Sequence, residues 1–105
     1  MNLLLQAMNE AELIEKLKRI EETTDHAERH SLALELAENP DRRIFDALVR
    51  LIQRPDLENR RGTLIYCLEV HDCSSITTLL RNIAKTGNFE AGMQAEVILD
   101  NQGLR

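Results

Sequence analysis

The apolar residues of this chain recur at intervals of three and four positions over almost its whole length, which is the spacing of one face of an α-helix. The inward-facing residues expected in the first five segments are Leu13, Ile14, Leu17 and Ile20; Ala33, Leu34, Leu36 and Ala37; Ile44, Phe45, Leu48, Leu51 and Ile52; Leu57, Leu64, Ile65 and Leu68; and Ile76, Leu79, Leu80 and Ile83. A further helix is expected between Asn88 and Gly103. Because no stretch alternates apolar and polar residues, we expect six helices and no strand.

Residue types that start and stop helices stand between these segments. Asn9 followed by Glu12 has the capping-box pattern, in which the two residues satisfy each other's free backbone N–H groups. The N-caps expected for later helices are Thr24 or Asp25, Asp41, Ser74 or Ser75, and Asn88. The expected stops are Asn39–Pro40, Pro55 and Gly87, the last in a left-handed conformation.

The helices recur in pairs. Three sets of apolar positions are spaced by 31 and then 32 residues, namely Leu13, Ile44 and Ile76; Leu17, Leu48 and Leu80; and Ile20, Leu51 and Ile83. The second helices also match, because "DHAER" at 25–29 and "DLENR" at 56–60 both read Asp-x-x-x-Arg. The shared offset predicts three helix-turn-helix units, about 9–38, 41–71 and 74–102, stacked in a single domain over 1–105.

The stretch "IFDALVRLIQRPDLENRRGTLIYCLE" resembles a HEAT repeat, with a first helix, a turn containing Pro and Asp, and a second helix that opens with acidic and Arg residues. The resemblance covers about residues 10–102. It implies an all-α fold of three HEAT-like repeats, a short right-handed α-solenoid whose second helices line the concave side. The third unit departs from the pattern because Gly92 stands where Arg60 would align, so a polar tie between turn and helix should be missing there.

Composition fits a globular helical protein: 105 residues, 43% hydrophobic, 30% charged and only 3% aromatic. The formal net charge of −5 disfavours nucleic acid and anionic membranes and favours a basic protein partner. The basic pairs Arg42–Arg43 and Arg60–Arg61 are matched by nearby acids, which gives no nucleic-acid signature.

The first ten residues have no basic region and no cleavage motif, and two cysteines do not make a disulfide framework. We therefore expect a cytoplasmic protein with reduced thiols. The apolar run Leu3, Leu4 and Leu5 is expected to pack on the first helix.

Cys67, His71 and Cys73 lie within seven positions and raise the question of a metal or redox site. Structural zinc takes four ligands, and this spacing matches neither a common zinc pattern nor the CxxC of a redox pair. We expect Cys67 to be a buried, small apolar side chain. His26 and His30 are four residues apart and could share a metal, but no further ligand set is evident.

No other pattern points to catalysis. The glycines are scattered and form no phosphate-binding loop, and no nucleophile stands with a base at a spacing that would bring them together. The sequence therefore predicts no enzymatic activity, no cofactor and no metal.

The exposed side of the second helices is the expected binding surface. Its predicted partner-binding residues are Glu28, Glu35, Glu38, Asn59, Thr63, Tyr66 and Glu69. The third unit is expected to continue this surface with Ala91, Ala95, Ile98 and Asn101. This gives an acidic end, a central tyrosine and an apolar end. Tyr66 is the only tyrosine of the chain, and an exposed tyrosine among acids is a typical anchor for a partner, although it could instead be half-buried.

These features favour a non-enzymatic module that binds another protein, with its oligomeric state open. "RRGTLIYCLEVHDCSS" is similar to short bacterial HEAT-like proteins, some of which act as immunity proteins against secreted toxins. That resemblance implies a cytosolic antitoxin, and the acidic balance suits a basic toxin such as a nuclease. One alternative is a lyase or chaperone acting on a chromophore or a partner protein, as in HEAT-like chains related to phycobilin lyases. Another is a scaffold subunit.

Overall fold

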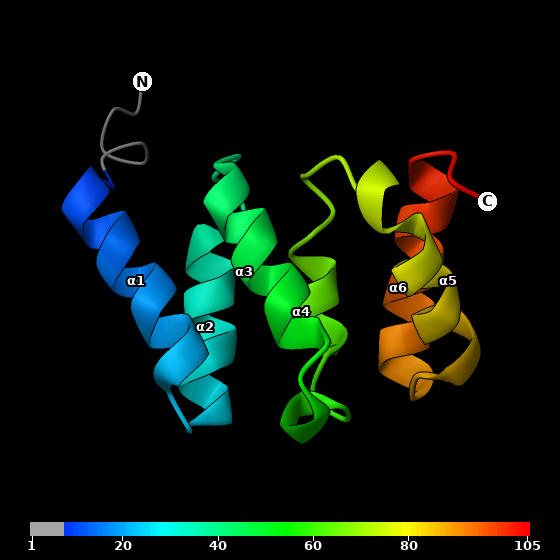
Figure 1. The fold of residues 1–105 in the computed structure, drawn as a ribbon, viewed down its shortest axis with the longest axis horizontal. Coiled ribbons are helices and arrows are strands. Elements are labelled where there is room, and N and C mark those ends of the chain that lie inside the picture. Colours follow the sequence, from blue (N-terminus) through cyan, green and yellow to red (C-terminus); the bar gives the residue numbers. More distant parts are fainter. Residues whose placement is uncertain (1–7) are drawn as a thin grey trace.

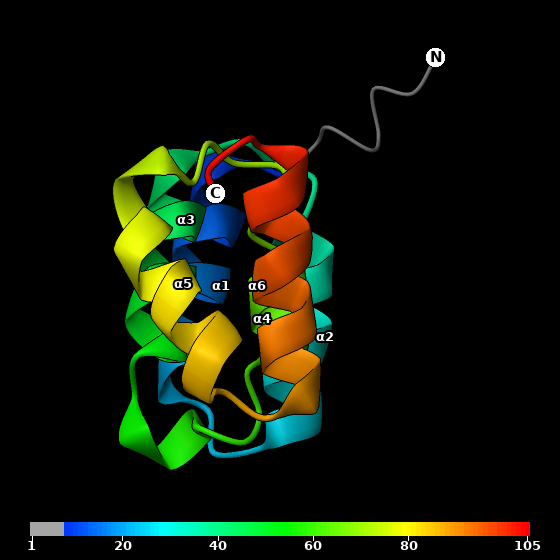
Figure 2. The same cartoon turned by 90° about the vertical axis from the view of Figure 1, so that its right-hand side faces the viewer.

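The helices form two layers (Figures 1 and 2). The computed structural model describes residues 8–105. One layer holds α1 (Glu10–Glu22), α3 (Arg42–Ile52) and α5 (Thr77–Thr86), and the other holds α2 (His26–Leu36), α4 (Gly62–Tyr66) and α6 (Phe89–Asn101). Short 3-10 turns, η2 (Pro55–Leu57) and η3 (Ser74–Ile76), precede α4 and α5. The described residues contain six α-helices and no strand, which confirms the expected all-α fold.

Each helix of the first layer packs on the helix that follows it, so the chain forms three consecutive hairpins. The hairpins also contact one another, through α1 with α3 and through α4 with both α2 and α6. Because the central hairpin has a neighbour on each side, every inward residue predicted for α3 is buried. Two residues that were predicted to face inward do not: Ile14 of α1 and Leu34 of α2 are about half exposed. The expected packing of Leu3, Leu4 and Leu5 lies outside the described residues.

Local capping positions most of the helix starts. The side chains of Asn9, Asp25, Asp41 and Asn88 each accept a backbone N–H at the start of α1, α2, α3 and α6. The serine caps predicted before α5 are wrong, because the Asp72 carboxylate accepts the N–H of Ser74 and neither serine side chain caps a helix.

The last hairpin contains a left-handed glycine after α6, not between α5 and α6 as predicted. Gly87 has a φ of −71°, so its predicted left-handed conformation is wrong. Gly103 has a φ of 65° and follows α6, where the N–H of Leu104 donates to the carbonyl of Leu99. This is the Schellman arrangement, which requires a left-handed residue and so favours glycine.

Two arginines tie the two halves of a hairpin to each other at equivalent places in the first and central hairpins. The Nε of the buried Arg29 donates to the carbonyl of Ile20 at 2.9 Å, and the Nη1 of Arg61 donates to the carbonyl of Ile52 at 3.2 Å. Both pairs span nine residues, so the first two units are related by 32 residues rather than 31. The predicted equivalence of Arg29 with Arg60 is therefore off by one residue.

The third unit has a glycine at the position of the arginine. A Cβ on Gly92 would lie 3.4 Å from the carbonyl oxygen of Ala84 and 3.6 Å from that of Ile83. Gly92 is thus equivalent to Arg61, 31 residues earlier, rather than to Arg60 as predicted, and it has no side chain that could form the polar tie. It follows that Ile20, Ile52 and Ile83 correspond to one another, and the predicted Leu51 is not their equivalent. Leu51 and Ile52 are both buried, so apolar spacing alone did not separate them.

The second helix of the central unit is much shorter than expected. The sequence predicted one helix through "DLENRRGTLIYCLEVHD", but the segment divides into η2, α4 and a run of turns over residues 67–71. In the layer formed by α2, α4 and α6, the central helix α4 is therefore shorter than its two neighbours. None of the helices formed by residues 8–105 is both long and apolar enough to span a bilayer.

Replacing Arg29 by methionine should cost about 1–3 kcal/mol of unfolding free energy, because the carbonyls of Ile20 and Thr23 would lose their buried donor. The matched control is Arg60→Met, at the exposed position that the sequence had paired with Arg29; its effect should stay within about 0.5 kcal/mol. Urea unfolding followed by circular dichroism measures both. Equal losses in the two variants would contradict the register found here.

Candidate functional site

A surface groove lies between the end of α2 and the turns that follow α4. It is about 300 Å³ in volume and is lined by Leu34, Ala37, Glu38, Tyr66, Cys67, Glu69 and Val70. Leu34, Tyr66 and Val70 are each 50–54% exposed, which is unusual for three large apolar side chains in one place. We refer to these seven residues as the α2–α4 groove.

The repeat register explains why these side chains meet. Leu34 and Tyr66 are 32 residues apart, as are Glu38 and Val70, so each pair occupies equivalent positions on neighbouring hairpins. Because α4 ends at Tyr66, the chain turns away there instead of extending the helix alongside α2. The sequence had placed Leu34 in the core and had not identified Val70. The 32-residue offset, applied to Tyr66, was the signal that would have found Leu34.

The wall of the groove formed by Glu69 and Val70 is held from behind by α6. The side chain of Gln102 donates to the carbonyl of His71 at 2.8 Å and to that of Glu69 at 3.3 Å, and it accepts the N–H of Cys73 at 2.9 Å. These three hydrogen bonds satisfy backbone groups that the broken helix leaves free. The third hairpin therefore positions a wall of a groove that lies between the first two.

His71 lies buried behind the same wall, with 4% of its surface exposed. Its ring contacts the ring of Phe45 at a centroid distance of 5.7 Å, and the guanidinium of Arg42 stacks on Phe45 at 3.7 Å. Its Nε2 has no hydrogen-bond partner among the described residues. Burial lowers the pKa of His71, and the charge of Arg42 lowers it further, against a smaller opposite effect of Asp41. The imidazole is therefore neutral in the folded protein at neutral pH.

Both cysteines are buried free thiols. Burial raises the pKa of each to about 11, so neither is a thiolate at neutral pH. The Sγ of Cys73 lies 3.4 Å from the carbonyl oxygens of both Leu68 and His71, which makes it part of the turn. Within the described part of the chain no three His, Cys, Asp or Glu side chains are grouped to hold a metal ion.

The predicted partner-binding residues are divided between different places. Glu38, Tyr66 and Glu69 line the α2–α4 groove. Glu35 is exposed but forms an ion pair with Lys16 at 3.6 Å. Asn59 is exposed in the loop before α4, and Thr63 is half-buried in α4.

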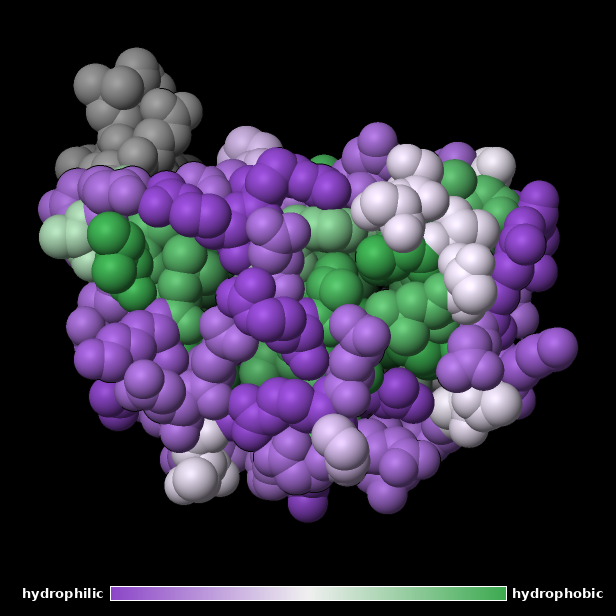
Figure 3. Space-filling view, viewed as in Figure 1, coloured by the Kyte–Doolittle hydropathy of each residue, from purple (hydrophilic) through white to green (hydrophobic). Residues whose placement is uncertain are grey.

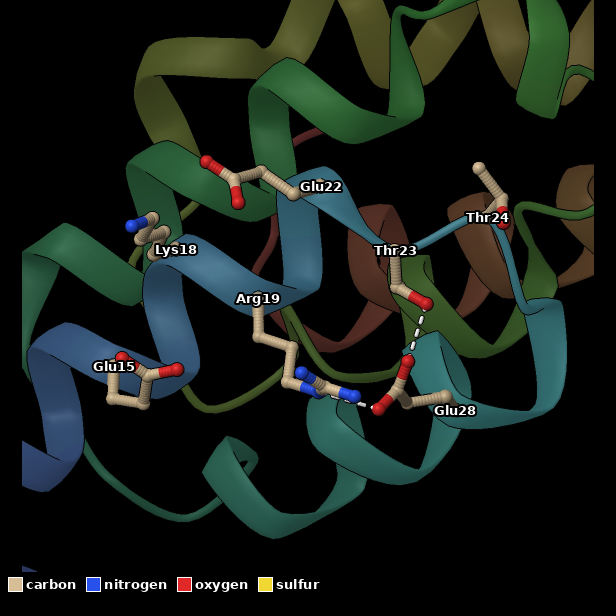
Figure 4. A pocket seen from close by; sticks show the side chains of 7 residues that line it. All are labelled: Glu15, Lys18, Arg19, Glu22, Thr23, Thr24 and Glu28. Carbon is tan, nitrogen blue, oxygen red and sulfur yellow. Dashed lines mark hydrogen bonds and ion pairs between the residues drawn. The ribbon is translucent and has the colours of Figure 1, made fainter.

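Glu28 lies outside the groove. It lines a polar pocket of about 430 Å³ at the connection between α1 and α2, where it bonds Arg19 and Thr23 (Figure 4). Arg19 already pairs with this carboxylate, and Glu28 is not among the residues that line the α2–α4 groove.

The apolar end predicted for the binding surface is also wrong. Ala91, Ala95 and Ile98 are fully buried against the other helices, and only Asn101 of the predicted set is exposed. The error is the same one-residue shift. With the observed offset of 31, the α6 position equivalent to Tyr66 is the half-buried Val97.

The opposite layer offers a different surface. The face of α1, α3 and α5 is largely hydrophilic, with apolar side chains visible between charged ones (Figure 3). Ion pairs link α1 to α3 across it, between Glu10 and Arg43 and between Glu21 and Arg50. These four charges are paired within the chain, in contrast to the carboxylates that line the α2–α4 groove.

No protein-family model, curated protein or solved structure matches this chain.

The buried neutral His71 should make the fold sensitive to mild acid. In the unfolded state this histidine has an ordinary pKa of about 6.5, whereas in the folded state its pKa is lower. The unfolded state therefore binds the proton more readily, and the protein becomes less stable as the pH falls below that value. In urea titrations the unfolding free energy of the wild type should fall between about pH 6.5 and 5, and His71→Leu should show a flatter profile.

Carboxylates supply the internal control. A hydrogen bond from Arg54 lowers the pKa of Asp56, which His71 does not affect, so the stability that Asp56 contributes is present at neutral pH and is lost in stronger acid. The wild type and His71→Leu should lose stability alike below about pH 4. Parallel profiles above pH 5 would contradict the role given to His71.

Proposed function

We propose that this chain is a non-enzymatic, protein-binding module that receives its partner in the α2–α4 groove. The observation that carries the proposal is the exposure of Leu34, Tyr66 and Val70 around one hollow. Covering them would remove apolar surface from water without moving the backbone, which is the usual driving force of association. Tyr66 is the aromatic residue of the set, and an exposed tyrosine is a typical anchor for a partner.

The charge of the groove supports a basic partner. Glu38 and Glu69 line it, and no Lys or Arg of the described residues lies within ion-pair distance of either carboxylate. The whole chain carries a formal net charge of −5. Both features would steer a positively charged protein toward the groove and would make its association sensitive to salt.

The narrower hypothesis is a cytoplasmic immunity protein that occludes a basic toxin domain. It rests on the resemblance of the sequence to HEAT-like proteins and on the acidic groove. A groove that accepts side chains of another protein is compatible with blocking an active site. The buried, protonated cysteines and the ion-paired polar pocket at the α1–α2 connection offer no comparable basis for catalysis.

The proposal is tested by capturing partners from native lysate with matched variants. The double variant Tyr66→Ala/Val70→Ser removes the apolar groove, and Phe89→Ser removes the most exposed apolar side chain, 83% exposed and outside the groove. We expect a basic protein to be retained by the wild type and by Phe89→Ser and to be lost from the double variant. Circular dichroism must show that all three proteins are folded.

Retention of the same proteins by the double variant would contradict the groove as the binding site. A partner lost only on Phe89→Ser would place binding on α6. Retention by the wild type should also decrease as salt rises from about 50 to 500 mM, because screening shortens the reach of surface charges.

A further inference from the structure

We infer that the α2–α4 groove recognises a single arginine side chain, presented by a basic segment of the partner. This inference rests on the proposed function, since it specifies what the partner places in the groove. Three properties of the site point to arginine: its size, its unpaired carboxylates and its exposed aromatic ring.

The size of the groove suits one long side chain. Its volume of about 300 Å³ is at the lower end of the range for ligand sites, so it has room for a side chain rather than for a whole helix. Leu34 and Val70 offer apolar contact for an aliphatic stem. Arginine and lysine bury such stems on apolar surface while their charged ends stay at the rim.

The two carboxylates that line the groove are not ion-paired within the described part of the chain. Glu10, Glu21 and Glu35 each pair with a basic side chain of a neighbouring helix. Glu38 and Glu69, which stand on the two sides of the groove after α2 and after α4, pair with none in the described part of the chain. Glu69 is also half-buried, so a partner's cation there would be less screened than one at a fully exposed acid.

Tyr66 favours arginine over lysine. A planar guanidinium stacks on an aromatic face and can donate two parallel hydrogen bonds to a carboxylate, whereas an ammonium is a compact, strongly hydrated charge. The chain contains an example of the same arrangement, because Arg42 stacks on Phe45 at 3.7 Å while it donates to the carbonyl of Asp72 at 3.1 Å. In the groove, Tyr66 would take the place of Phe45 and the glutamates would take the place of the carbonyl.

The test uses three short peptides that differ in one side chain. The probe is N-acetyl-Gly-Leu-Arg-Leu-Gly-amide; its matched forms carry citrulline, which has nearly the shape of arginine without the charge, or lysine. Protein labelled at Leu and Val methyl groups is titrated with each peptide and followed by NMR. We expect the arginine peptide to shift the methyl signals of Leu34 and Val70 and to bind about tenfold more tightly than the citrulline peptide, with lysine between them.

Two variants locate the effect. Glu38→Gln/Glu69→Gln should reduce the affinity for the arginine peptide to that of the citrulline peptide. Glu15→Gln/Glu22→Gln changes two carboxylates of the polar pocket near α1 and should leave the affinity unchanged. Equal binding of the arginine and citrulline peptides would overturn the inference, as would shifts that avoid Leu34 and Val70.

The outcomes separate this inference from the proposed function. If the captured partner depends on Tyr66 and Val70 but the arginine peptide does not bind, the protein-binding function stands and arginine recognition is wrong. If the groove methyl signals change on concentrating the protein alone, with dimers detected by sedimentation, the groove receives a second copy and the inference is also wrong.

Discussion

Arg29 donates from a buried guanidinium to two carbonyl oxygens at the C-terminal end of α1, those of Ile20 and Thr23. The last carbonyls of a helix have no partner within it and carry partial negative charge, so a cation there both satisfies and stabilises them. Because Arg29 belongs to α2, the same contact fixes how the first hairpin turns. Arg61 makes the corresponding contact with Ile52 in the central hairpin. In the third, Gly92 stands at the equivalent position and has no side chain to make the contact.

The groove depends on this repeated contact. The contact recurs after 32 residues in the central hairpin, and the same offset relates Leu34 to Tyr66, which line the groove together. The early end of α4 then leaves the hollow open, and Gln102 of the third hairpin holds its far wall by bonding the carbonyls of Glu69 and His71. A surface of seven residues thus draws on all three hairpins, which explains how a small chain can present a rigid site.

Features that depend on local sequence were predictable. The caps at Asn9, Asp25, Asp41 and Asn88 were found because a capping side chain acts within three residues of its own position. The all-helical fold and the buried face of α3 followed from apolar spacing. Tyr66 was selected because a single exposed aromatic residue among acids stands out even without a structure.

Features that depend on the residue offset between hairpins were not predictable. Leu51 and Ile52 are adjacent and both apolar, and Arg60 and Arg61 are adjacent and both basic, so the sequence allowed two alignments one residue apart. The wrong alignment placed Ile98 on the surface, although it is buried, and apolar spacing alone had placed the half-exposed Leu34 in the core. Gln102 gave no local signal at all, since its hydrogen bonds reach back 29 to 33 residues.

The central claim is that the partner docks in the α2–α4 groove, and photo-crosslinking in the producing cell tests it most directly. The photoreactive residue p-benzoylphenylalanine is placed at position 66 in one protein and at position 89 in another, both exposed sites. The account predicts a covalent adduct with a basic protein from position 66, mapped to an arginine-containing segment, and little or none from position 89. An adduct formed from position 89 with none from position 66 would contradict it.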